Sequence, residues 1–151
     1  MFQVILFFAL LADANETGKL HLEWKVQSQD DEPITSVAFS PDGGIIATGC
    51  GRFVGFLQEP RGGFAEIRNA KSGRIIQTLR DHGDGVCSLQ FHPRKKELAT
   101  FSFDGIVRLW RTDTWITTKK FDAGRPLTCG CYSHSGDLVC AGGIALVDEG
   151  R

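Results

Sequence analysis

Short runs of alternating apolar and polar residues occupy most of the chain, with glycine-containing turns between them. Three of these runs align with one another and cover residues 34–43, 86–95 and 127–136. Apolar side chains occupy alternate positions in each run, and each run ends in a polar turn. This pattern is typical of a β-strand with one buried face. No useful length of sequence has the period of an amphipathic helix, so the pattern predicts an all-β chain.

A second short apolar strand follows each aligned run, at residues 45–49, 98–102 and 138–142. The middle unit continues into a third strand at 106–110 and a fourth at 115–121, which matches residues 74–79 of the unit before it. Tyr132 follows Phe91 by 41 residues, and Phe91 follows Phe39 by 52, the same period with a longer connection. Four strands per unit, joined by hairpin-length turns, predict the antiparallel blades of a β-propeller.

The net charge and the length of the apolar runs argue against two classes of function, nucleic-acid binding and membrane spanning. The 151 residues carry a net charge of −1, which argues against a protein that grips nucleic acid through its phosphates. No apolar run reaches the roughly 18–20 residues that a membrane-spanning helix needs. The chain is long enough for one domain with a sizeable core. The expected partners are therefore proteins rather than nucleic acids or a bilayer.

Five cysteines cannot all pair within one chain, because the count is odd. All five lie in apolar or glycine-rich stretches, which predicts small buried side chains. Cys129 and Cys131, two apart on one strand face, could meet an ion together with His134. The spacing matches no common zinc pattern and the usual second ligand pair is missing, so no metal or other cofactor is expected.

Residues 1–17 form an apolar leader that precedes the repeats at 18–151. The run Val4–Ala12 followed by Asp13-Ala14 has the form of a signal-peptidase site, and Asn15-Glu16-Thr17 is a glycosylation sequon. Against secretion, Met1-Phe2-Gln3 has no basic residue. A buried strand of a preceding unit is the alternative. We expect a cytoplasmic or nuclear protein, or one in the secretory pathway if residues 1–14 are cleaved.

Residues 82–110 resemble a WD repeat of the G-protein-beta-like β-propeller family, and looser copies extend the resemblance to about residues 20–148. The resemblance implies a hydrogen-bonded structural tetrad formed by His82, Thr100, Asp104 and Trp110. An Asp–His–Thr chain also occurs in hydrolases, but no nucleophile lies on a strained turn here. We therefore expect a structural role for these residues and no catalytic residue in the chain.

Departures from the family pattern make this a divergent and incomplete member. Arg111 follows Trp110, where the family has Asp. In the first unit Arg68 replaces the tryptophan and Asp30 replaces the loop histidine; in the third unit Cys140 is expected at the hydroxyl position. About three blades cannot close a ring, since propellers need 4–8. The prediction is a partial propeller that associates with other blades or chains.

The loops of such blades fall on two faces. The face formed by residues 30–33, 81–85 and 123–126, with 51–63 and 103–105, includes the 11-residue surplus of the first unit. Aromatic and arginine side chains are enriched in binding hot spots, so this face is the expected partner site. Its candidate residues are Arg52, Phe53, Phe56, Leu57, Arg61, Asp81, Asp84 and Arg125. On the opposite face, residues 94–96 form a small basic cluster.

The function that follows is a non-catalytic scaffold for protein–protein interactions. Two alternatives remain open: a secreted or lumenal propeller with chemistry at its central channel, and a truncated gene product without independent function.

Overall fold

The computed structural model describes residues 8–9, 24–25, 28, 30–52 and 62–144 of the chain. In these ranges the chain forms strands and turns, and no helix long and apolar enough to cross a membrane is found. One four-stranded antiparallel sheet has the order β3 (Ile34–Phe39), β4 (Ile45–Cys50), β5 (Phe64–Asn69), β6 (Ile75–Leu79). The next has the order β7 (Val86–Phe91), β8 (Glu97–Ser102), β9 (Ile106–Arg111), β10 (Thr117–Asp122). The predicted all-β meanders are confirmed.

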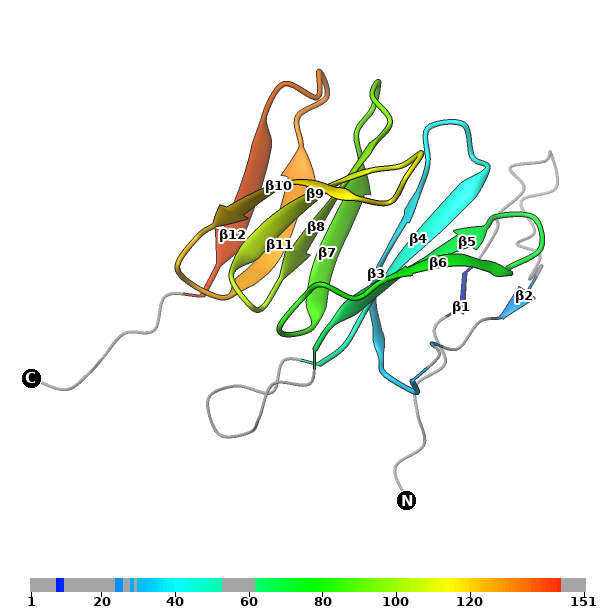
Figure 1. The fold of residues 1–151 in the computed structure, drawn as a ribbon, viewed down its shortest axis with the longest axis horizontal. Coiled ribbons are helices and arrows are strands. Elements are labelled where there is room, and N and C mark those ends of the chain that lie inside the picture. The colour runs from blue at the N-terminus through cyan, green and yellow to red at the C-terminus, as the bar shows by residue number, and fades with distance from the viewer. Residues whose placement is uncertain (1–7, 10–23, 26–27, 29, 53–61, 145–151) are drawn as a thin grey trace, which may run out of the picture.

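Two smaller sheets complete the described structure. β11 (Leu127–Tyr132) pairs with β12 (Val139–Gly143), and β1 (Phe8–Ala9) pairs with β2 (Trp24–Lys25). Figure 1 shows the sheets side by side as blades, with β7–β10 between β3–β6 and β11–β12. The β3–β4, β7–β8 and β11–β12 loops point to the same side. The described sheets are open, as a partial propeller requires. Apart from β1, the predicted leader at 1–17 lies outside the described residues.

The first strand of each blade contains the same bulge. The register shifts between Ile34 and Ser36, between Val86 and Ser88, and between Leu127 and Cys129. The bulged side chain bonds a carbonyl of the neighbouring strand in each blade, through Thr35 to Gly49 (3.0 Å), Cys87 to Phe101 (3.2 Å) and Thr128 to Gly142 (3.4 Å). This repetition shows that the three units are structural copies of one another.

Adjacent blades are joined along their first strands. The Ser36 hydroxyl accepts a hydrogen bond from the backbone N–H of Leu89 (3.2 Å). One blade later, the Ser88 hydroxyl donates to the carbonyl of Gly130 (3.0 Å), and the Gln90 side chain accepts from the N–H of Tyr132 (2.6 Å). Polar side chains of one first strand thus satisfy backbone groups of the next, which fixes the spacing of the blades.

The core lies between blades. One cluster joins the first and second blades and consists of Ala47, Ala65, Ile67, Leu79, Val86, Leu89, Phe91, Leu98 and Trp110. A second cluster joins β7–β10 to β11–β12 and consists of Ala99, Phe101, Val107, Leu109, Leu127 and Tyr132. The β7–β10 sheet therefore packs its two faces against different neighbours, and the same sheet in isolation would leave both faces exposed to water.

Two predictions from the sequence need correction. The expected strand 115–121 begins later, at Thr117, because Trp115 has a φ of 56° and its N–H closes a turn onto the carbonyl of Arg111 (2.7 Å). The cysteines are also not all buried. Cys129, Cys131 and Cys140 are exposed, since they lie on the face of β11–β12 that points away from the second blade.

The loops between blades approach one another through glycine. A Cβ atom at Gly85 would lie 2.8 Å from the carbonyl carbon of Gly51 and 2.9 Å from the carbonyl oxygen of Arg52. We expect Gly85→Ala to lower the free energy of unfolding by about 1–3 kcal/mol, because backbone atoms would have to shift. Chemical denaturation measures this change. Gly44→Ala is the matched control, since its Cβ would meet only the Asp42 side chain at 3.5 Å; equal losses for both variants would contradict the prediction.

Candidate functional site

Three of the four predicted tetrad residues meet at the hydroxyl of Thr100 on β8. The Nε2 atom of His82, in the β6–β7 loop, lies 2.7 Å from this oxygen, and the indole N–H of Trp110 on β9 donates to it over 2.8 Å. All three residues are at least 95% buried. The Trp110 ring belongs to the core cluster between the first two blades. The contact therefore ties a surface loop to the packing between blades.

Asp104, the fourth predicted residue, anchors the turn between β8 and β9. Its carboxylate accepts backbone N–H groups from Gly83 (2.8 Å) and Ile106 (2.9 Å). Its Oδ2 lies 3.5 Å from Nδ1 of His82. The carboxylate thus links the β8–β9 turn to the loop that precedes β7.

Arg108 is a fifth member of this network, which the sequence analysis did not single out. Its guanidinium lies 2.7 Å from Nδ1 of His82 and 2.9 Å from Oδ2 of Asp104. A guanidinium can only donate, so Nδ1 of His82 accepts and Nε2 carries the ring proton that faces Thr100. The signal was available: Arg108 and Trp110 are two apart on one strand, so a charged residue had to share the buried face of Trp110.

The charges of the network balance. Arg108 is 4% exposed and also lies 3.4 Å from a carboxylate oxygen of Asp81, which in turn pairs with Lys120 at 2.7 Å. Burial lowers the pKa of His82, and Arg108 lowers it further while Asp104 opposes this. Burial raises the pKa of Asp104, but the hydrogen bonds from the backbone N–H groups of Gly83 and Ile106 oppose this, and the pKa lies well below its ordinary range. The ring is therefore neutral and Asp104 ionised near pH 7.

The first blade fills the corresponding positions with an ion pair. Arg68 occupies the place of Trp110, as expected, because it pairs with Ile46 as Trp110 pairs with Leu98. Its guanidinium lies 2.5 Å from the carboxylate of Glu66, and both side chains are buried. The expected replacement Asp30 pairs instead with Arg80 over 2.7 Å. Equivalent buried positions are thus occupied by an ion pair in the first blade and by a hydrogen-bonded tryptophan in the second.

The third blade departs from the prediction by one residue. Val139 pairs with Tyr132 as Leu98 pairs with Phe91, so Ala141 rather than Cys140 occupies the position of Thr100. Alignment of the sequence repeats makes Leu138 the equivalent of Leu98, because both residues are leucine. The turn shows otherwise, since the Ser133 N–H bonds the carbonyl of Leu138 just as the His92 N–H bonds that of Glu97.

The predicted partner surface is a row of loops in contact. Gly85 contacts the backbone of Arg52, its carbonyl accepts the N–H of Phe103 (2.9 Å), and Gly105 approaches the backbone of Arg125. Arg52 and Arg125 are exposed, and the Asp81 side chain is 42% exposed. The remaining candidates Phe53, Phe56, Leu57 and Arg61 lie outside the described residues.

Asp84 differs from the other candidates on this surface. It is 9% exposed, and its carboxylate accepts the N–H of Gly85 (2.7 Å) while its backbone carbonyl accepts from Ser102 (2.8 Å). Burial raises its pKa, an effect that the hydrogen bond to Gly85 partly offsets. These contacts make Asp84 a support of the loop more than a contact residue.

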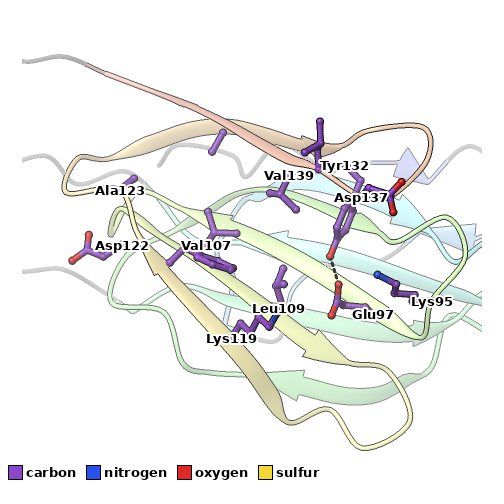
Figure 2. Close-up of a pocket in the computed structure, with 14 residues that line it drawn as sticks. Lys95, Glu97, Val107, Leu109, Lys119, Asp122, Ala123, Tyr132, Asp137 and Val139 are labelled. Atoms are coloured by element: carbon purple, nitrogen blue, oxygen red, sulfur yellow. Dashed lines mark hydrogen bonds between the residues drawn. The ribbon is translucent and has the colours of Figure 1, made fainter.

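A groove on the side of the blades was missed from the sequence. It has a volume of about 550 Å³ and lies between β9–β10 and β12 (Figure 2). Its walls include Val107, Leu109, Phe121, Val139 and Ala141. The Tyr132 hydroxyl donates to the Glu97 carboxylate (2.8 Å) in this wall. The related feature of the sequence is that no Asp-Gly turn follows Gly143; among the described residues β12 pairs with β11 alone.

Within the described ranges, no group of three or more His, Cys, Asp or Glu side chains could hold a metal ion. Cys129, Cys131 and His134 are exposed and do not form such a group.

Removal of the shared hydroxyl tests the network. We expect Thr100→Val to lower the free energy of unfolding by about 1–3 kcal/mol, because the buried N–H groups of His82 and Trp110 lose their acceptor. Trp110→Ala should cost about 3–5 kcal/mol through the cavity between the blades. Chemical denaturation provides both values. Thr118→Val on the exposed strand β10 is the control, and unchanged midpoints for the two network variants would refute a stabilising role.

Acid should weaken the fold through His82. Its native pKa lies below the ordinary value of about 6.5, so the unfolded state binds more protons as pH falls through 6.5. This contribution to stability is complete above that pH, and it declines below it by at most about 1.4 kcal/mol per pH unit. The stability of His82→Gln should depend less steeply on pH between 7 and 5.5. Identical slopes for the variant and the unmodified chain would contradict a buried neutral imidazole.

Comparison with known proteins agrees with the geometry. The family model "WD domain, G-beta repeat" matches residues 22–54 and 73–111. WD repeat-containing protein 90 of Mus musculus is 28% identical over 134 residues, which cover 83% of this chain and 6% of that protein. The U4/U6 small nuclear ribonucleoprotein PRP4-like protein of Arabidopsis thaliana is 36% identical over 84 residues, covering 56% of this chain and 14% of that protein.

The solved structure of the RRP9 WD40 repeats resembles this chain with a TM-score of 0.54 and 21% identity, over 64% of this chain and 27% of that one. The chain thus spans a small part of each of these relatives. The repeated four-stranded blades, the family match and the similar propeller structure together show that the chain belongs to the WD-repeat family.

Proposed function

We propose that the chain is a non-catalytic interaction module that binds a protein partner through the loop face containing Arg52, Asp81 and Arg125. The observation that carries the proposal is the backbone contact between successive loops at Gly51, Gly85 and Gly105. This contact holds two exposed arginines and an aspartate on one continuous surface. The guanidinium group of arginine donates several N–H groups in one plane, and carboxylates and backbone carbonyls of a protein partner can accept them.

The polar network supports a structural role over catalysis. The imidazole of His82 has both ring nitrogens engaged, and the Thr100 hydroxyl receives two donors. Neither the hydroxyl nor the ring is exposed to a substrate. Proteins of this family are in general scaffolds without enzymatic activity, which agrees with this assignment.

A nuclear or cytoplasmic location fits this function best. One of the relatives is named as part of a small nuclear ribonucleoprotein. We extend to this chain only the kind of role, assembly within a multi-component particle, with a protein rather than RNA as the direct contact, because the net charge is −1.

Charge reversal on the two faces tests the proposed surface. We expect the double variant Arg52→Glu, Arg125→Glu to capture about tenfold less partner than the unmodified chain. Quantitative mass spectrometry of affinity-purified complexes measures the captured amount. Replacement of residues 53–62 by a short Gly-Ser turn should have a similar effect. Lys95→Glu, Lys96→Glu on the opposite face is the matched control and should retain the partner. Loss in the control with retention in the first variant would assign binding to the opposite face.

A further inference from the structure

A second groove opens between the first two blades, at the end of the strands opposite the loop face. It has a volume of about 370 Å³, and we refer to it as the interblade groove. Its walls are the β3–β4 turn of the first blade and the β7–β8 and β9–β10 turns of the second. Because a described four-stranded sheet lies on each side, the groove lies within the described structure and not at its end.

Part of the lining of the interblade groove is apolar. Ile45, the first residue of β4, and Phe91, the last of β7, line it. Pro41 and Pro93 line it from the adjoining turns. Phe91 belongs to the core cluster between the first two blades, and Ile45 packs against that cluster. An aliphatic side chain bound here would therefore add to an existing apolar interface and leave water.

The β7–β8 turn brings two lysines to the groove. Lys95 and Lys96 are exposed and line it, and the ion pairs among the described residues include neither of them. Arg94 in the same turn lies 3.7 Å from the Asp137 carboxylate of the third blade. Lys95 also lines the groove beside β12, whereas Lys96 lines the interblade groove alone of the two. Two positive charges at this wall thus have no acidic partner in the described part of the chain.

The backbone that presents these lysines is held in place by hydrogen bonds. The Nδ1 atom of His92, a residue that is 1% exposed, accepts the N–H groups of Arg94 and Lys95, each over 2.9 Å. The carbonyl of Lys96 accepts the N–H of Thr112 in the β9–β10 turn (3.0 Å). A ligand would therefore not have to order this turn, which lowers the entropic cost of binding.

Two carboxylates in the other walls restrict which anion fits. Asp42 lines the groove, and hydrogen bonds from the Ser40 hydroxyl (2.6 Å) and the Gly44 N–H (3.0 Å) lower its pKa, so it is ionised near pH 7. Asp113 lines it as well and lies 3.5 Å from Arg111. A polyanion with a charge on every unit, such as RNA, would bring phosphates against these carboxylates. A polypeptide with acidic residues only beside the lysines would not.

We propose that the interblade groove binds an extended acidic segment of a partner protein, with an aliphatic side chain against Ile45 and Phe91 and carboxylates beside Lys95 and Lys96. The carboxylates complement the two lysines. The aliphatic contact is needed as well, because ion pairs that face water contribute little by themselves. The site lies at the opposite end of the strands from the loop face that contains Arg52, so the two surfaces bind different segments.

The probe is a fluorescein-labelled peptide, Gly-Ser-Gly-Leu-Glu-Glu-Glu-Gly-Ser-Gly, whose binding to the full chain is followed by fluorescence anisotropy. We expect replacement of the three glutamates by glutamine to weaken binding by about tenfold, and replacement of the leucine by glycine to weaken it by about fivefold. A single-stranded RNA decamer should bind more weakly than the peptide. In nuclear magnetic resonance spectra, the amides of residues 93–96 and 112–113 should shift most on addition of the peptide.

Two double variants with the same change in charge test the position of the site. Lys95→Glu, Lys96→Glu should weaken peptide binding by about tenfold or more. Lys71→Glu, Arg74→Glu is the matched control, because these exposed residues flank the β5–β6 turn on the same end of the first blade but do not line the groove. The control should keep the affinity of the unmodified chain.

Four results would overturn the proposal: equal affinity for the glutamate and glutamine peptides, equal losses in the two double variants, tighter binding of the RNA than of the peptide, or no binding of the peptide at all. The last result includes a groove that another segment of the chain already fills. The loop-face variant Arg52→Glu, Arg125→Glu should bind the peptide normally. Failure of the peptide experiment therefore leaves the proposed function intact, and failure of the loop-face experiment leaves this site intact.

Discussion

The three described blades depend on one another, because side chains on the first strand of one blade bind backbone groups on the first strand of the next. Ser36 serves Leu89, and Ser88 and Gln90 serve Gly130 and Tyr132. These hydrogen bonds hold the sheets at a distance at which their facing apolar side chains pack against each other. The largest core cluster accordingly contains residues of both four-stranded sheets. Stability is a property of pairs of blades and not of single sheets.

The polar network in the second blade follows from the same constraint. A loop that leaves one blade and enters the next must satisfy its polar groups next to an apolar interface. Asp104 accepts the backbone N–H of Gly83 in this loop, and the loop residue His82 binds the Thr100 hydroxyl. Arg108 introduces a buried cation, which two carboxylates balance. The first blade reaches a similar balance with Glu66 and Arg68 in direct contact. Different residue sets are compatible with the fold provided that each buried charge has a partner.

The strand pattern and the turn residues were predictable from the sequence, because they depend on local alternation and on a period near 41 residues. The proximity of His82, Thr100 and Trp110 could be anticipated in the same way, since the resemblance fixes their places on adjacent strands. The position of Ala141 could not be placed as readily, because it depends on the register between strands, and a one-residue shift inverts it. The face of Arg108 follows from its spacing to Trp110, but its contact with His82 comes from a loop distant in the sequence. The exposure of Cys131 and Phe121 depends on which neighbour covers a blade, and local sequence contains no such information.

Native-state hydrogen exchange, read by residue, tests most directly whether stability resides between blades. We expect amides of β4, β7 and β8 to exchange slowest and at a common rate, because they open only when the first two blades separate. Amides of β12 should exchange faster than those of β4, β7 and β8, since among the described residues β12 pairs with β11 alone and its Val139 side chain is 39% exposed. Protection of β12 equal to that of β8, or separate opening of the two four-stranded sheets, would show that stability does not reside between the blades.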